Sequence, residues 1–129
     1  MTLHHYSPTP WTLDRERTYE QPELHFKPNG LWLSVDDDWQ RWCEGEDFNR
    51  DGLMHHTEIV ISSSANILTI SDVRALDAFT AKYRLGGTRV LDALRAIDWP
   101  RIVAEYDGIL IAPYLWERRL TGHTFWYYC

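Results

Sequence analysis

The stretch TEIVISSSANILTISDVRALDAFTAKYRLGG, residues 57–87, decides the fold, because its hydrophobic period changes halfway along. The first half is rich in β-branched residues and is interrupted near residues 63–66, which is typical of two strands or one bent strand. The second half follows a Ser71 or Asp72 cap, ends at two glycines and carries apolar residues at helical spacing, namely Val73, Leu76, Phe79 and Tyr83. Strands that lead into a helix predict an α+β fold.

Downstream of this stretch we predict two further helices and two further strands. The first helix spans residues 88–97, and the second opens with Asp98 as its cap and with Pro100 in its first turn. ILIAPY, residues 109–114, is a candidate buried strand, and HTFWYYC, residues 123–129, is a candidate aromatic strand. The C-terminal part therefore also mixes helices with strands.

Upstream, the sequence predicts two strands. LHHYS, residues 3–7, alternates along its length and is brought to an end by the prolines that follow. A Pro-Asn-Gly turn at residues 28–30 then leads into a second strand over residues 31–35. Because side chains alternate along a strand, Trp32 and Ser34 are expected to face the same side.

The segment after the second strand predicts a short acidic helix. Three aspartates at residues 36–38 stand where a helix N-terminus favours negative charge, and Trp39, Trp42 and Cys43 follow at helical spacing. We expect two turns of helix, with Cys43 used for packing rather than as a nucleophile.

Composition excludes several classes of protein. A chain of 129 residues that is 44% apolar is expected to form a single domain over residues 1–129. It contains no apolar run of the roughly 18 residues that span a bilayer, and its start lacks the pattern of a signal peptide, so we expect a soluble, cytoplasmic protein. The net charge of -6 disfavours nonspecific binding to nucleic acid or to anionic membranes.

DFNRDGLMHHTE, residues 47–58, fits the calcium-loop pattern at every fixed position. An EF-hand also needs a helix after the loop, and the β-branched residues that follow Glu58 favour a strand instead. We therefore interpret the loop as a connector between helix and strand and keep calcium binding as a remote alternative. No histidine pair has a further ligand pair at zinc spacing, so we expect no metal site.

Four motifs together resemble a known family: LHHYS at residues 3–7, GLWLS before the aromatic helix, EIVISSSANILTI, and AEYDGILI. They resemble the small ADP-ribosyltransferases of the histidine-containing branch, which occur as toxins, effectors or phage-type modifying enzymes. The resemblance implies a split two-sheet fold with short helices and a cleft for NAD. It also implies cleavage of the nicotinamide–ribose bond and transfer of ADP-ribose to a macromolecular acceptor, with protein favoured over nucleic acid.

The resemblance also assigns roles to residues. His5 is the first-strand histidine that orients NAD, and Glu117 is the favoured catalytic glutamate, with Glu105 as the other candidate. The expected NAD contacts are Tyr6, Ser7, Trp32, Ser34 and Trp39, with Trp42 as a further stacking candidate and Arg118 or Arg119 as a phosphate contact. The family's glutamate normally lies at a late strand, and Leu110 occupies that inner position here.

Each of these residues has a structural alternative. His5 is also compatible with a hydrogen-bonded core histidine, Ser34 with a helix cap, and Glu117 with a solvated ion pair. The tryptophans are also compatible with a core cluster. The alternative function is a catalytically silent interaction protein on the same scaffold, using its exposed aromatic residues as contacts.

Overall fold

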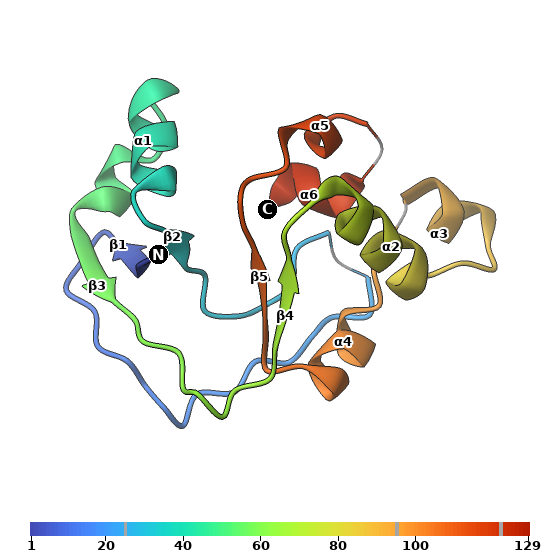
Figure 1. Ribbon diagram of the computed structural model, residues 1–129, viewed down its shortest axis with the longest axis horizontal. Coiled ribbons are helices and arrows are strands. Elements are labelled where there is room, and N and C mark those ends of the chain that lie inside the picture. The colour runs from blue at the N-terminus through green and yellow to red at the C-terminus, as the bar shows by residue number, and fades with distance from the viewer. Residues whose placement is uncertain (25, 95, 122) are drawn as a thin grey trace. The chain divides into compact units, whose positions relative to one another are not determined.

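The computed structural model describes residues 1–24, 26–94, 96–121 and 123–129, and within them the chain forms two compact units (Figure 1). Unit 1 comprises Met1–Thr18 and Gly30–Ser63, and unit 2 comprises Tyr19–Asn29 and Ser64–Cys129. Each unit contains one small sheet and short helices, so the α+β class is confirmed. That the two units make up one domain stays a prediction.

Unit 1 is a three-stranded antiparallel sheet with a helix beside it. The strand β1 (Leu3–Ser7) lies in the middle, between β2 (Ser34–Val35) and β3 (His55–Glu58). The helix α1 (Asp38–Gly45) and the short 3₁₀ helix η1 (Arg50–Leu53) connect β2 to β3. The predicted first strand and the predicted two-turn acidic helix are confirmed.

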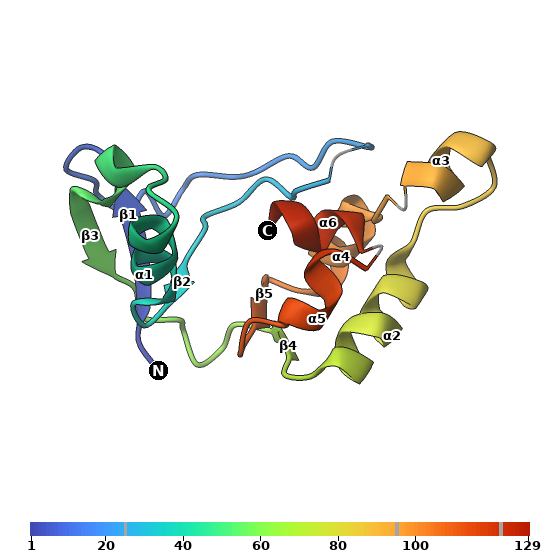
Figure 2. The ribbon, with the colours of Figure 1, turned by 90° about the horizontal axis from the view of Figure 1, so that it is seen from above.

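Unit 2 is built on two parallel strands, β4 (Ile67–Ile70) and β5 (Gly108–Ile111), which need a long connection because both run in the same direction. Helices supply that connection and also follow β5: α2 (Val73–Tyr83), α3 (Arg89–Leu94), α4 (Trp99–Glu105), α5 (Trp116–Arg119) and α6 (Thr124–Tyr128). The buried core is formed by Ile70, Leu76, Phe79, Tyr83, Ile97, Trp99, Ile102, Leu115, Phe125 and Trp126. Figure 2 shows α5 and α6 side by side.

The caps of two helices agree with the sequence. The Asp72 side chain accepts a hydrogen bond from the Ala75 amide at 2.8 Å, so Asp72 rather than Ser71 caps α2. Asp98 accepts from the Arg101 amide at 3.2 Å, and Pro100 stands in the first turn of α4. Both boundaries follow from local chemistry that the sequence displays directly.

The predicted C-terminal strand over residues 123–129 is wrong, because this segment forms α6. Aromatic residues favour strands only where a neighbouring strand and a half-buried surface are present. Here Phe125 and Trp126 are buried in the core of unit 2, and the Trp126 indole donates a hydrogen bond to the Leu115 carbonyl at 2.9 Å. Burial of one helical face therefore overrides local propensity.

Three other boundaries differ from prediction. The second strand, predicted over residues 31–35, is only Ser34–Val35, and the Trp32 carbonyl before it contacts the His5 side chain. Residues 57–70, predicted as two strands or one bent strand, contribute to two strands: β3 begins earlier, at His55, and ends at Glu58, and β4 is Ile67–Ile70. The helix predicted over residues 88–97 is described as Arg89–Leu94, Ile97 forms a bridge with Arg84, and residue 95 lies outside the described residues.

Among the described helices, none is long and apolar enough to cross a membrane.

Candidate functional site

His5 lies on the middle strand of unit 1 with its ring held on two sides. Its Nδ1 is 3.0 Å from the Trp32 carbonyl oxygen. Because a carbonyl only accepts, Nδ1 carries a hydrogen and donates it to the Trp32 carbonyl. The Trp11 ring packs against the imidazole with 4.4 Å between centroids and an angle of 49°. These contacts fix both the tautomer and the orientation of His5.

Trp11 is a site residue that none of the sequence motifs singled out. The signal for it lies in Pro8 and Pro10, which end β1 and turn the chain so that the next aromatic residue returns to the strand. Trp32, which supplies the carbonyl, has a 39% exposed side chain. His5 is therefore associated with two tryptophans, of which the sequence predicted one.

The sheet register separates the other predicted contacts into two faces. Residues opposite each other in paired strands share a face, and successive residues alternate between faces. Since His4 pairs with Ser34 and His5 pairs with Thr57, His5 and Ser7 lie on one face while Tyr6 and Ser34 lie on the other. The sheet thus divides these four predicted site residues into two pairs, one on each face, and only Ser7 shares the face of His5.

Two hydroxyl-bearing residues already have structural partners. Ser7 is only 8% exposed. Its hydroxyl donates a hydrogen bond to the Thr9 carbonyl at 2.8 Å. The Ser34 hydroxyl accepts from the Trp39 amide at 3.0 Å, which stabilises the start of α1. The capping alternative for Ser34 is therefore observed.

Trp39 belongs to an aromatic cluster on α1. Its ring stacks on Trp42 with 5.2 Å between centroids and an angle of 17°. Phe48 meets both rings edge-on, at 6.3 Å from Trp39 and 5.5 Å from Trp42. Cys43 is completely buried, as the packing interpretation predicts, and burial raises the pKa of its thiol.

Glu117 lies on α5 in unit 2, whereas His5 lies in unit 1. Glu117 is exposed, and its backbone carbonyl accepts a hydrogen bond from the Thr121 hydroxyl at 2.9 Å. The other candidate, Glu105, accepts from the Tyr83 hydroxyl and pairs with Lys82 and Arg101, each at 3.2 Å. These partners, led by Tyr83, lower the pKa of Glu105. Glu105 therefore serves a structural network, which leaves Glu117 as the better candidate.

The two arginines beside Glu117 have different surroundings. Arg118 donates two hydrogen bonds to the Asp77 carboxylate, at 2.7 and 2.8 Å, and His123 Nε2 lies 2.7 Å from the same carboxylate. The Arg118 guanidinium, together with His123, holds the pKa of Asp77 well below its usual range. Arg118 is therefore held by Asp77.

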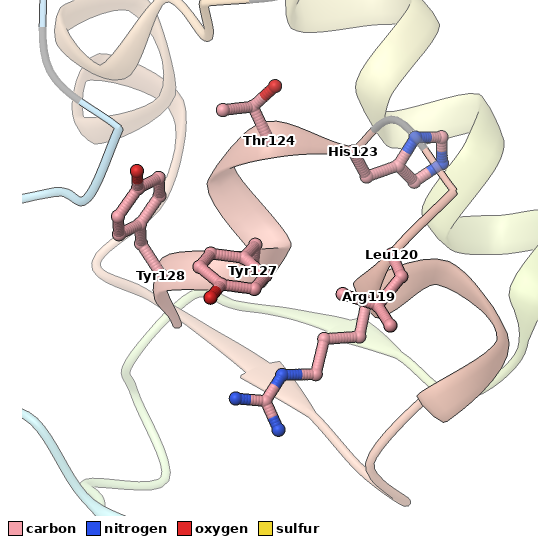
Figure 3. Close-up of a pocket in the computed structure, with 6 residues that line it drawn as sticks. All are labelled: Arg119, Leu120, His123, Thr124, Tyr127 and Tyr128. Atoms are coloured by element: carbon pink, nitrogen blue, oxygen red, sulfur yellow. The ribbon is translucent and has the colours of Figure 1, made fainter.

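Arg119 lines an open pocket of about 260 Å³ between α5 and α6 (Figure 3). The residues around it are Arg119, Leu120, His123, Thr124, Tyr127 and Tyr128. The Arg119 guanidinium carbon lies 5.7 Å from the Trp116 ring centroid and 5.6 Å from that of Tyr127, within range for cation–π attraction. The His123 ring points toward α2, consistent with its contact with Asp77.

The calcium-like loop has a structural role in unit 1. Asp47 accepts a hydrogen bond from the Arg50 Nε at 2.6 Å, and the loop continues through η1 into β3 rather than into a second helix. Within the described ranges, no group of three or more histidine, cysteine, aspartate or glutamate side chains is arranged to hold a metal ion. The helix–loop–helix of a calcium switch is not formed.

No protein-family model, curated protein or solved structure matches this chain.

Proposed function

We propose that this chain is an NAD-dependent ADP-ribosyltransferase that cleaves the nicotinamide–ribose bond and passes ADP-ribose to a macromolecular acceptor. The observation that carries the proposal is the fixed His5 ring, held by the Trp32 carbonyl at 3.0 Å and by the Trp11 ring at 4.4 Å. A neutral imidazole fixed in this way presents Nε2 as an acceptor, which suits a ribose hydroxyl donor.

The expected reaction also needs a carboxylate. Cleavage of the nicotinamide–ribose bond develops positive charge on the ribose, and a carboxylate that accepts from the ribose hydroxyls stabilises that charge in the transition state. We assign this role to Glu117, because Glu105 is held by Tyr83, Lys82 and Arg101. Arg119 is the proposed phosphate contact, since a guanidinium matches phosphate geometry.

The register and contacts refine the proposed NAD site. Trp32 remains a favoured contact, because its backbone carbonyl bonds to the His5 ring. Trp11 joins Trp32 as the ring against His5. Ser7 lies on the same face of the sheet as His5, but it is buried and its hydroxyl donates to the Thr9 carbonyl, so its assignment becomes weaker. The proposed NAD contacts of three other residues are less well supported. Tyr6 and Ser34 lie on the face of the sheet opposite His5, and the Trp39 ring stacks on Trp42.

The acceptor in this proposal is a protein in the cytoplasm of the producing cell or of a host. The net charge of -6 supports this choice, because an acidic protein repels a nucleic-acid polyanion.

The direct test is to incubate the protein with NAD and to follow nicotinamide release and thermal stability. We expect release by the wild type and loss of release in His5→Ala and Glu117→Ala. His56→Ala and Glu20→Ala, which change exposed residues of the same types, are the matched controls. The proposal fails if the wild type releases no nicotinamide above buffer and NAD does not raise its melting temperature. Full activity in Glu117→Ala would overturn only the assignment of the glutamate.

A second candidate function is a catalytically silent interaction protein. The observation that favours it is the exposure of aromatic side chains on α5 and α6, with Trp116 58%, Tyr127 49% and Tyr128 50% exposed. Tryptophan and tyrosine are enriched among residues that dominate binding energy at protein interfaces. A folded protein that neither binds nor cleaves NAD would support this function over the enzyme.

A further inference from the structure

The charge of this protein is concentrated in one segment. Residues 36–58 contain eight acidic residues and two arginines, so the segment carries the whole formal net charge of -6. The rest of the chain is balanced, with eleven basic and eleven acidic residues. The segment forms α1, η1 and β3 and lies entirely in unit 1.

The same segment presents aromatic rings. Trp39 and Trp42 stack on each other, and Phe48 meets both edge-on while remaining 51% exposed. We refer to these three rings, together with the exposed carboxylates of residues 36–58, as the α1 surface. It combines the exposed Phe48 ring and the half-buried Trp39 and Trp42 rings with strong negative charge.

The basic residues of the segment are already used by its own acids. Arg41 pairs with Asp37 at 3.2 Å and with Asp38 at 2.7 Å, and Arg50 pairs with Asp47 at 2.6 Å. The excess negative charge also reaches the neighbouring strand, because Asp37 and Glu44 contribute, after burial, to the raised pKa of Tyr6. Both arginines of the segment are thus paired within it, and its formal charge of -6 favours an incoming cation.

We propose that the α1 surface docks a protein segment in which arginine or lysine side chains alternate with apolar side chains. The cations of the partner interact with the surplus carboxylates and with the faces of the indole rings, and its apolar side chains pack against Phe48. Charge complementarity selects this partner over a nucleic acid or an anionic membrane, which the segment repels. The docking does not depend on NAD chemistry.

Affinity for such a partner depends on salt. The exposed charges are screened over about 8 Å at physiological ionic strength and over about 3 Å at 1 M, so the electrostatic part of the binding falls as salt is added. The apolar part, centred on Phe48, remains. Both contributions are measurable with one labelled peptide.

The test uses a short fluorescent peptide in which arginine alternates with leucine, and a matched peptide in which glutamate replaces arginine. Fluorescence anisotropy measures the binding of each peptide to the full chain. We expect the basic peptide alone to bind, with affinity that falls as salt rises. Glu44→Gln/Glu46→Gln is expected to weaken binding about threefold to tenfold, because exposed charge pairs each contribute little. Phe48→Ala is expected to weaken it about tenfold.

The matched control is Glu20→Gln/Glu23→Gln, which removes the same number of exposed carboxylates from unit 2. It should bind as the wild type does, and circular dichroism of every variant establishes that it is folded. The proposal is overturned if the basic peptide does not bind at low salt, if the acidic peptide binds equally well, or if the control weakens binding as much as the α1 variant. Phe48→Leu keeps an apolar side chain and separates loss of the ring from loss of folding.

Discussion

Replacing Asp77 by Asn tests the ionic group that ties three elements of unit 2 together. From α2, Asp77 accepts two hydrogen bonds from Arg118 on α5, at 2.7 and 2.8 Å, and contacts His123, just before α6, at 2.7 Å. Asparagine has one acceptor oxygen instead of two, and its amide group would face the N–H donors of Arg118. The substitution therefore keeps the size of the side chain and removes most of these bonds.

The magnitude follows from the exposure of the partners. Hydrogen bonds to charged groups contribute about 1.5–3 kcal/mol each when buried, whereas exposed ion pairs contribute at most about 1 kcal/mol. The Asp77 side chain is 42% exposed and that of Arg118 is 29% exposed, so water can replace much of the hydrogen bonding between them that the substitution removes. The His123 side chain is only 15% exposed, so water compensates less for the loss of its contact with Asp77. We expect Asp77→Asn to lower the free energy of unfolding by about 1–3 kcal/mol.

The same carboxylate predicts a pH dependence. Its pKa is lower in the folded protein than in the unfolded chain, because Arg118 and His123 stabilise the ionised form. Its contribution is therefore complete above the unfolded pKa of about 3.9 and is lost as the pH falls below that value. Asp77→Asn should lose less stability than the wild type when the pH is lowered from about 5 to about 3.

Urea unfolding at several pH values, followed by circular dichroism, measures both effects. Asp92→Asn is the matched control, because Asp92 is 54% exposed and lies 3.4 Å from Arg84, and it should cost at most about 0.5 kcal/mol. If Asp77→Asn is no more destabilising than Asp92→Asn, or if the acid dependence is unchanged, the reasoning is refuted.

Three further predictions concern thiols, a helix cap and calcium. Burial raises the pKa of Cys129 to about 12 and also raises that of Cys43, so at pH 8 both thiols should react slowly with a disulfide reagent until urea unfolds the chain; rapid reaction of both would contradict this. Asp72→Ala should lower the free energy of unfolding by about 1 kcal/mol, and Ser71→Ala should cost clearly less, in the same urea assay. Calcium at micromolar concentrations should not produce a saturating change in tryptophan fluorescence, because residues 47–58 lead into a strand; saturation there would restore the calcium interpretation.

For the candidate site, the sequence indicated the strand on which His5 lies more reliably than it indicated which side chains contact His5. His5 was predicted on the first strand, and it lies there with the tautomer fixed by the Trp32 carbonyl. The ring against it belongs to Trp11, which no motif marked, because the contact depends on how the chain turns after β1. The roles of His5 and Glu117 in NAD chemistry stay predictions for the nicotinamide assay.

The sequence by itself determined the features that depend on neighbours within a few residues. The α+β class, a cap at Ser71 or Asp72, the Asp98 cap and the acidic helix after the second strand follow from hydrophobic period, side-chain capping and the charge preference of helix termini. The concentration of negative charge in residues 36–58 is likewise visible in the sequence alone.

Only the tertiary structure decided the contacts between distant residues. Arg118 and His123 meet Asp77 across 41 and 46 residues, and no local pattern encodes such a pairing. Residues 123–129 form α6 rather than a strand, because burying Phe125 and Trp126 against the core of unit 2 outweighs the β-propensity of an aromatic run. Secondary structure set by packing can be assigned only when the packing partners are known.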